Sequence, residues 1–249
     1  MSRFLAALQF LTTIPVPWRR EVVPGEFGRS VGYFPVVGII IGLILAGLNW
    51  LFGLFLPLSV ANALLIVSLV VISGALHLDG FVDTCDGIAG HKTIEDRWQV
   101  MNDSHAGGFG IIGVVLLLLV KFISLNSVPE SSLMITLVLM PVLSRWAMVY
   151  AIFAYPYAKP SGLGKAFKQG ASWPRFTMAT IVTTAVAVVL TQLIGLAIMF
   201  LLWIITVAMA AYFKSKFSGL TGDTYGAINE VAEVSVLILI SLLGRFGLI

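Results

Sequence analysis

Hydrophobic residues occupy long continuous segments of this chain, and shorter polar stretches separate them. A helix of about 20 apolar residues can cross a bilayer, whereas a strand of a membrane barrel shows about 10 residues of alternating polarity. We therefore expect an all-α, polytopic integral membrane protein that forms one helical membrane domain over residues 1–249. The pattern predicts about seven transmembrane helices, at residues 33–56, 58–78, 108–124, 131–155, 176–193, 196–213 and 227–243.

The N-terminal apolar segment, residues 4–13, is too short to cross a bilayer and is followed by Pro15 and Pro17. Arg19 and Arg20 then follow instead of the small residues of a cleavage site, which argues against a signal peptide. We expect a retained N-terminal interfacial helix. The alternative is a surface helix that only anchors the N-terminus.

Glycines are present within the first predicted span, at positions 38, 42 and 47. Gly38 and Gly42 are four positions apart and therefore share one face of a helix. Small residues at that spacing predict that a second helix packs closely against this face.

Composition agrees with a membrane protein. The chain is 59% hydrophobic and 11% charged, with a mean hydropathy of +1.00. Soluble domains carry about 25% charged residues, so a single soluble core is excluded. The net charge of +3 comes from basic residues scattered between the predicted spans, which does not indicate nucleic-acid binding.

The basic residues indicate the orientation in the membrane, because cytoplasmic connections carry an excess of Lys and Arg. The connections near Pro57, residues 126–130 and Gly195 contain none, and only Arg245 of the tail lies on their side. We therefore expect a cytoplasmic (inner) membrane protein with its N-terminus in the cytoplasm and its C-terminus on the far side. The connections predicted to be cytoplasmic contain Arg3, Arg19, Arg20, Arg29, Lys92, Arg97, Lys159, Lys165, Lys168, Arg175, Lys214 and Lys216.

Acidic residues concentrate between positions 77 and 110. Six of the 12 lie there: Asp79, Asp83, Asp86, Glu95, Asp96 and Asp103. The first three are spaced i, i+4 and i+7, which places their carboxylates on one face of a helix, where they repel one another unless a cation lies between them. Mg²⁺, Mn²⁺ and Ca²⁺ prefer such oxygen ligands. The alternative is a solvated acidic helix end.

Glycines surround these aspartates. Gly80 and Gly87 directly follow two of them and leave room for a bulky polar ligand near the backbone. Asp103 is followed by Ser104 and Gly107. These residues form either a polar turn that caps the next span or a fourth metal ligand beside backbone N–H groups that face phosphate, and we favour the ligand.

A second polar group spans residues 219–233. Asp223 lies in a connection, whereas Asn229, Glu230 and Glu233 lie in or at the mouth of the last span. An ionisable group inside a span costs at least about 2.5 kcal/mol on insertion scales, so these acids are functional candidates. The alternative places them just outside the hydrocarbon. Arg145 is the basic counterpart, and pairs either with one of these acids or with a phosphate.

Lysines that could bind the phosphates of a nucleotide lie in the predicted cytoplasmic connections. Individually each is better explained as a positive-inside anchor. The candidates are Lys159, Lys165, Lys168, Lys214 and Lys216.

Several blocks of this sequence resemble the cobalamin synthase family, the adenosylcobinamide-GDP ribazoletransferases. The most specific block is His-Leu-Asp-Gly-Phe-Val-Asp-Thr-Cys-Asp-Gly at 77–87, followed by Asp-Ser-His-Ala-Gly-Gly-Phe-Gly at 103–110. Further blocks lie at 10–17, 33–42 and 219–233, so the resemblance covers nearly the whole chain. It implies a membrane-bound, Mg²⁺-dependent phosphotransferase that joins adenosylcobinamide-GDP to α-ribazole, or to its 5′-phosphate, and releases GMP. The product would be adenosylcobalamin or its phosphate.

The resemblance also implies roles for individual residues. Asp79, Asp83, Asp86 and Asp103 would hold one or two Mg²⁺ ions at the diphosphate, and Asp103 or Glu230 would accept the proton of the attacking hydroxyl. The catalytic candidates are Asp83, Asp86, Asp103 and Glu230. The substrate-binding candidates are Gly80, Gly87, Arg97, Ser104, Gly107, Lys214, Lys216, Asp223, Asn229 and Glu233.

Two other functions compete with this one. CDP-alcohol phosphotransferases of phospholipid synthesis share a short Asp-x-x-Asp-Gly motif, but follow it closely with Ala-Arg, whereas Gly87 is followed by Ile88, Ala89 and Gly90 here. A transporter often shows an internal repeat, and none is visible. Whether the protein forms a homo-oligomer stays open.

Overall fold

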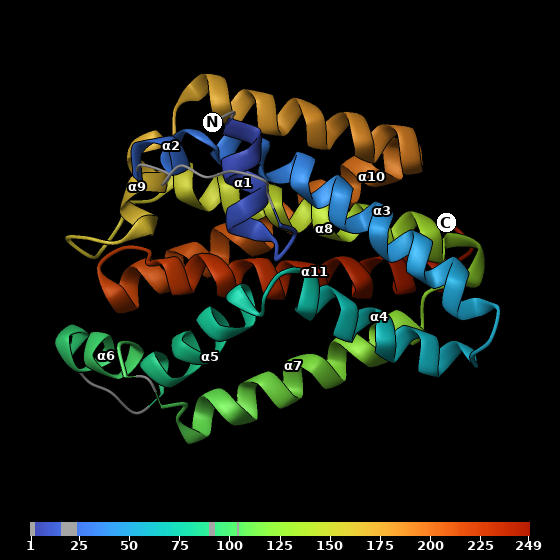
Figure 1. The fold of residues 1–249 in the computed structure, drawn as a ribbon, viewed down its shortest axis with the longest axis horizontal. Helices are drawn as coiled ribbons and strands as arrows, with labels where there is room; N and C mark the ends of the chain where they lie inside the picture. The colour runs from blue at the N-terminus through green and yellow to red at the C-terminus, as the bar shows by residue number, and fades with distance from the viewer. Residues whose placement is uncertain (1–2, 16–23, 90–92, 104) are drawn as a thin grey trace.

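A computed structural model describes residues 3–15, 24–89, 93–103 and 105–249 of the chain (Figure 1). The predictions for Arg19, Arg20, Lys92 and Ser104 fall outside these residues. The helices are α1 (Arg3–Leu11), α2 (Pro24–Arg29), the 3₁₀ helix η1 (Val31–Tyr33), α3 (Phe34–Gly53), α4 (Leu58–Ile72), α5 (Leu76–Ile88), α6 (Ile94–Met101), α7 (Gly108–Asn126), α8 (Glu130–Ala154), α9 (Leu163–Gly170), α10 (Trp173–Phe217) and α11 (Gly222–Arg245).

The predicted all-α membrane class is confirmed. Within the described residues, five helical segments are long and apolar enough to cross a membrane: Val31–Gly53, Gly108–Asn126, Glu130–Ala154, Trp173–Phe217 and Gly222–Arg245. A sixth is added if α4 and α5 together form one broken span. The predicted number of seven spans stays a prediction. It is reached only if α4 and α5 form one span and if the two halves of α10 are counted as two spans.

The second predicted span, residues 58–78, is not a continuous helix. Instead α4 ends at Ile72, and α5 continues at an angle of 89° from Leu76. Gly74 and Ala75 both adopt positive φ angles, 62° and 56°. The N–H of Ala75 donates to the carbonyl of Val70 at 2.9 Å, the closing bond of a glycine-terminated helix end. The chain therefore turns before the aspartates, so that α5 crosses the bundle instead of extending α4.

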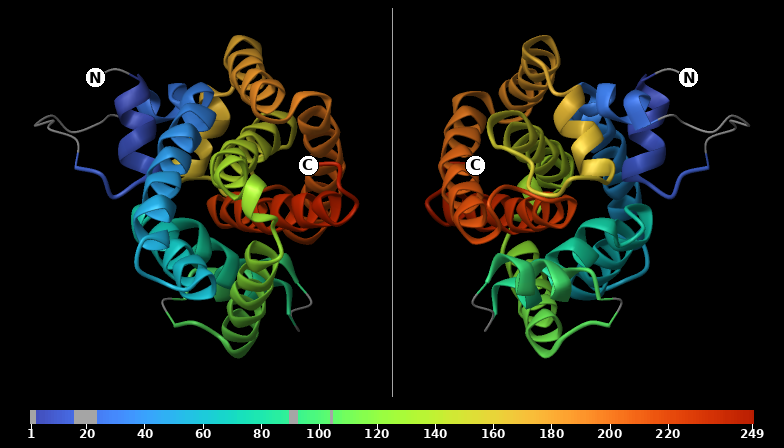
Figure 2. Two further views of the ribbon diagram at one scale, coloured as in Figure 1. Left: turned by 90° about the vertical axis from the view of Figure 1, so that its right-hand side faces the viewer. Right: turned by 90° about the vertical axis from the view of Figure 1, so that its left-hand side faces the viewer.

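The predicted division of residues 176–213 into two helical segments is observed inside α10. Gln192 has φ 53° and ψ −133°, which no helix can accommodate, and the chain reverses there (Figure 2). The hydroxyl of Thr184 donates to the sulfur of Met199 at 3.7 Å, so the two halves lie side by side. The break occurs at Gln192, three residues before the glycine expected to separate the segments.

The core is built around α8, which lies among α3, α10 and α11 (Figure 2). Most of its residues are buried. The close packing predicted at Gly38 and Gly42 is confirmed: a Cβ at Gly38 would lie 2.9 Å from the Cα of Val142, and one at Gly42 would lie 2.6 Å from the Cα of Val138.

We expect Gly38→Ala to destabilise the protein by about 1–3 kcal/mol, because the added methyl group would collide with the α8 backbone. Gly47→Ala is the matched control on the same helix, since a Cβ there would meet no atom within 4 Å. Melting temperatures of both variants in detergent measure the difference. Equal melting temperatures would contradict the packing described here.

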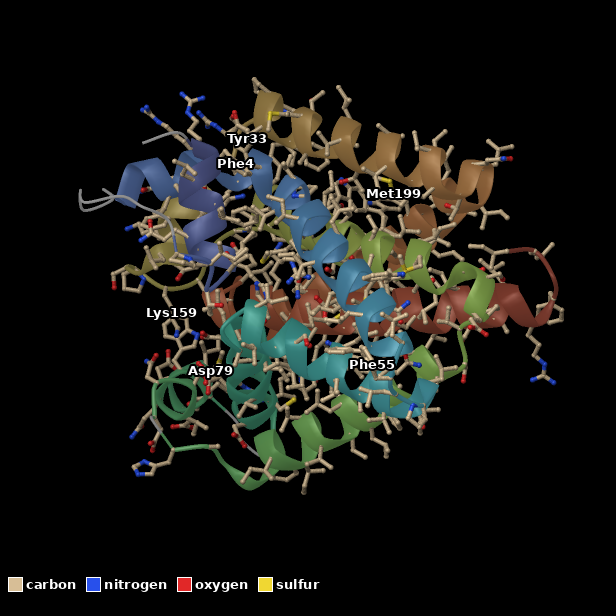
Figure 3. The ribbon with its side chains drawn as sticks, turned by 45° about the vertical axis from the view of Figure 1, so that its right-hand side comes forward. Phe4, Tyr33, Phe55, Asp79, Lys159 and Met199 are labelled. Atoms are coloured by element: carbon tan, nitrogen blue, oxygen red, sulfur yellow. The ribbon has the colours of Figure 1, made fainter. Side chains whose placement is uncertain are left out.

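The connections divide between two ends of the molecule. The end of α5 and the starts of α7 and α11 lie at one end, whereas the C-terminus lies at the other (Figure 1). Asp79 and Lys159 share the first end, and Phe55, in the connection after α3, lies at the second (Figure 3). The polar segments 77–110, 156–175 and 214–233 therefore meet, as the hydrogen bonds below show. Which side of the membrane they face stays a prediction.

Candidate functional site

A cavity of about 440 Å³ opens where these polar segments meet. Its polar mouth includes Asp79, Asn102, Lys159 and Asp223. Its interior is largely apolar and aromatic, with side chains from α1, α3, α8 and α9. Its apolar and aromatic residues include Phe10, Phe34, Met148, Ile152 and Phe167.

Backbone pairing holds the connection after α8 at the mouth. The N–H of Ala158 donates to the carbonyl of Leu220 at 2.8 Å, and the N–H of Leu220 donates to the carbonyl of Pro156 at 2.8 Å. Gly219 makes this possible: its φ is 155°, and a Cβ there would lie 2.9 Å from the nitrogen of Ala158. Segments more than 60 residues apart are joined in this way.

Lys159 is the cation of the mouth. Its ammonium donates to Asn102 Oδ1 at 3.0 Å and to Asp223 Oδ2 at 3.2 Å. The sequence favoured a membrane anchor at this position, and its only local signal was a lysine between prolines and glycines. The structure adds that its ammonium lies between the end of α6 and the start of α11.

Asp223 lies beside the aspartates of α5. A Cβ at Gly80 would lie 2.8 Å from the carbonyl oxygen of Asp223, so the missing side chain lets α11 cross α5 here. The space beside Gly80 is thus filled by α11, although Gly80 also lines the cavity. The Asp83 carboxylate interacts electrostatically with Asp223 and Asp79, which repel it, and with Lys159, which attracts it. The mouth therefore has an excess of negative charge.

Asp86 turns away from this group. Its Oδ2 accepts the N–H of Gly107 and its Oδ1 accepts the N–H of Gly110, both at 2.8 Å. The carboxylate is buried and caps the first turn of α7, where free N–H groups favour an anion. Gly107 thus donates to Asp86, whereas the sequence suggested that it faces a phosphate.

Asp103 is exposed and contacts His105 instead of the other aspartates. Its Oδ1 accepts the N–H of His105 at 2.9 Å and lies 2.8 Å from the imidazole Nδ1. These hydrogen bonds from His105 hold the pKa of the Asp103 carboxyl below its usual range. Asp103 does not line the cavity.

The carboxylates of the mouth suit a magnesium ion that takes most of its ligands from elsewhere. Among the residues that the structure describes, no three His, Cys, Asp or Glu side chains are grouped so that they could hold a metal ion by themselves. Mg²⁺ usually binds through one or two carboxylates and takes further ligands from substrate phosphates and water. Asp79 and Asp223 line the same mouth, and Asp83 interacts with both, so the donor chemistry fits. The predicted set of Asp79, Asp83, Asp86 and Asp103 stays a prediction.

Arg97 and Gly87 connect α6 to the end of α5. Nη1 of Arg97 donates to the carbonyls of Gly87 and Ile88, at 3.1 and 3.0 Å. A Cβ at Gly87 would lie 2.6 Å from Cγ of Met101, so the room expected for a ligand is occupied. Both residues position the helix that carries the aspartates, and their predicted contacts with substrate stay predictions.

Lys214 and Lys216 lie in the last turn of α10. Nζ of Lys216 is 5.4 Å from the centroid of the Tyr212 ring. Neither lysine lines the cavity. A phosphate contact by either one stays a prediction.

The intramembrane acids form a buried network with two cations. Lys121 donates to Glu230 Oε2 at 2.6 Å and to Glu233 Oε2 at 2.7 Å. The guanidinium of Arg145 pairs with Glu233 Oε1, which confirms one of the two pairings expected for it. Asn229 Nδ2 donates to the same oxygen at 3.1 Å. All four charged side chains are at most 5% exposed, and their charges cancel.

Lys121 was missed from the sequence, although it is the one charged residue inside the apolar run 108–124. An isolated lysine in a span is itself a signal for a buried partner. None of Lys121, Arg145, Glu230 and Glu233 lines the cavity. The predicted roles of Glu230 as base and of Asn229 and Glu233 in substrate binding therefore have no support from the position of the cavity.

Comparison with known proteins shows which family the chain belongs to. The model of the cobalamin-5-phosphate synthase family matches residues 3–241. The adenosylcobinamide-GDP ribazoletransferase of Geotalea daltonii is 36% identical over 244 residues, which cover 98% of each chain. The enzyme of that name from Roseiflexus sp. is 36% identical over 95% of this chain and 88% of its own. No solved structure matches. The chain therefore belongs to the cobalamin-5-phosphate synthase family.

Proposed function

We propose that this membrane protein joins adenosylcobinamide-GDP to α-ribazole or to its 5′-phosphate. A hydroxyl of the ribazole ribose attacks the phosphorus that carries the cobinamide, the bond to the bridging oxygen breaks, and GMP leaves. The product is adenosylcobalamin or its phosphate. The observation that carries this proposal is the meeting of Asp79, Asp223 and Lys159 at the mouth of one cavity, in a family whose relatives are named for this transfer.

Two carboxylates of the mouth, those of Asp79 and Asp223, would hold Mg²⁺ there, with Asp83 beside them. When bound, the ion neutralises charge on the diphosphate and on the departing GMP. Lys159 adds a positive charge beside the phosphates, and its contact with Asn102 ties α6 to the same position. Asp86 keeps α7 against α5 through the N–H groups of Gly107 and Gly110.

The proton of the attacking hydroxyl goes to a carboxylate of the mouth. Asp79 is exposed and lines the cavity, so it can reach a hydroxyl there. The bases suggested by the sequence, Asp103 and Glu230, lie outside the cavity lining. We place the mouth on the cytoplasmic side of the inner membrane, in accordance with the distribution of basic residues.

The direct test is GMP release by the purified protein in liposomes supplied with adenosylcobinamide-GDP and α-ribazole. We expect release with Mg²⁺ and essentially none with excess EDTA, together with a corrinoid product that carries the lower base. Release of CMP from a CDP-alcohol in the same vesicles would identify a phospholipid-type transferase instead. Solute flux without any release of GMP would identify a transporter.

A further inference from the structure

The size of the cavity limits which part of the substrates it can hold. Ligand pockets typically measure about 300–1,000 Å³, and this one, at about 440 Å³, is at the small end. A nucleoside fits such a volume. A corrinoid macrocycle with its side chains is several times larger and must stay outside.

Three phenylalanines form an aromatic wall of the cavity. The ring centroid of Phe10 lies 4.5 Å from that of Phe167, and the Phe34 centroid lies 5.4 Å from that of Phe167. They come from α1, α3 and α9, so the N-terminal helix contributes directly to the site. Met148 and Ile152 of α8 add further apolar surface. A flat, apolar ring system gains the most from such surroundings.

Two polar side chains interrupt this apolar lining. His77 is 2% exposed and Tyr225 is 3% exposed, and both line the cavity. Within the described part of the chain, both ring nitrogens of His77 lack a hydrogen-bond partner, and so does the hydroxyl of Tyr225. A buried polar group without a partner costs free energy, which a bound ligand can recover by supplying the partner.

His77 can supply a hydrogen-bond donor inside the cavity. An imidazole ring carries at least one N–H group in each of its tautomers. Because His77 lines the cavity and neither of its ring nitrogens has a partner among the described residues, its N–H group can donate to a ring nitrogen of a bound base.

We propose that the cavity binds the base of the acceptor nucleoside, a benzimidazole, and that His77 donates a hydrogen bond to its free ring nitrogen. This inference rests on the proposed function. A benzimidazole joined to ribose through one nitrogen keeps a single acceptor nitrogen on an otherwise apolar ring. Guanine, the other candidate, presents several donors and acceptors that the apolar walls do not satisfy. With the base inside, the ribose hydroxyls point towards Asp79 at the mouth.

The test measures binding of α-ribazole to the intact protein in nanodiscs by calorimetry, without corrinoid. It compares wild type with His77→Phe, and α-ribazole with the analogue in which the free ring nitrogen is replaced by C–H. Either change alone should weaken binding roughly tenfold, the order expected for one buried hydrogen bond. Both together should weaken it no further than one alone, because the same contact is removed.

Several results would overturn the inference: no binding of α-ribazole to wild type, equal affinity for the C–H analogue, or competitive displacement of α-ribazole by GMP. His105→Phe is the matched control, because His105 is exposed and outside the cavity. If His77→Phe does not fold, two other measurements replace it. Wild type should bind the C–H analogue more weakly than α-ribazole, and His77→Gln, which keeps a donor, should retain more affinity for α-ribazole than for the analogue. GMP release that proceeds while α-ribazole binds elsewhere would refute this inference alone, whereas intact binding without any turnover would refute the proposed function.

Discussion

Asp223→Asn should lower Mg²⁺-dependent GMP release by on the order of 100-fold, because it weakens the hold on the metal ion that would stabilise the negative charge of the departing GMP, and loss of one such electrostatic contribution typically costs about that much. Asp223 lines the cavity, interacts with Asp83 and pairs with Lys159 at 3.2 Å. The amide keeps the shape of the side chain but supplies no charge to a metal ion. Activity should recover partly when the Mg²⁺ concentration is raised.

Two further variants make this result specific. Asp96→Asn is the matched control, because Asp96 is exposed in the first turn of α6 and does not line the cavity. Asp103→Asn separates the two candidate ligand sets. If Asp103 binds the metal, as the sequence suggested, this variant should lose as much GMP release as Asp223→Asn. If the ligands are those at the cavity mouth, it should lose less. Full activity of Asp223→Asn at limiting Mg²⁺ would refute its assignment to the metal.

Glu233→Gln should destabilise the protein by about 3–5 kcal/mol, the cost of breaking a buried ion pair by removing one partner. Glu233 accepts hydrogen bonds from both Lys121 and Arg145, and without its charge only Glu230 remains to balance two buried cations. The melting temperature in detergent, followed by circular dichroism, measures the loss. Glu95→Gln is the control, because Glu95 is exposed on α6.

A second substitution tests whether charge balance is the cause. Adding Arg145→Met to Glu233→Gln leaves one cation, Lys121, facing one anion, Glu230, and should restore part of the lost stability. A double variant that melts lower than Glu233→Gln would show that the guanidinium stabilises the core through other contacts. An unchanged melting temperature for Glu233→Gln alone would refute the network as a source of stability.

The membrane class and the positions of the helices could be predicted from the sequence, because both depend on the hydrophobicity and hydrogen bonding of residues that are close together in the chain. Apolar segments of about 20 residues can satisfy their backbone polar groups in a bilayer only as helices. The i, i+4 spacing of Asp79 and Asp83 predicts a shared face, and both lie on α5. Gly38 and Gly42 likewise predicted that a second helix packs closely here, because small side chains allow a close approach, but only the structure identifies that helix as α8.

The direction of the chain after each turn was not predictable in the same way. The span predicted at residues 58–78 ignored Gly74 and Ala75, whose left-handed backbone turns α5 by 89° from α4. Nothing in the apolar pattern distinguishes a broken helix from a straight one. Yet this turn places the aspartates beside the start of α11.

The neighbours of each acid were decided by tertiary structure. The i, i+7 spacing placed Asp86 with Asp79, and the following polar stretch added Asp103. In the structure Asp86 caps α7 and Asp103 faces His105. Asp223 and Lys159 joined them from distant segments, through the crossing at Gly80 and the backbone pairing of Ala158 with Leu220. Sequence alone determined that helices cross a membrane and that acids concentrate at one end of them. Which acids share a cavity depended on helix crossings, whose geometry is set by contacts between residues far apart in the chain.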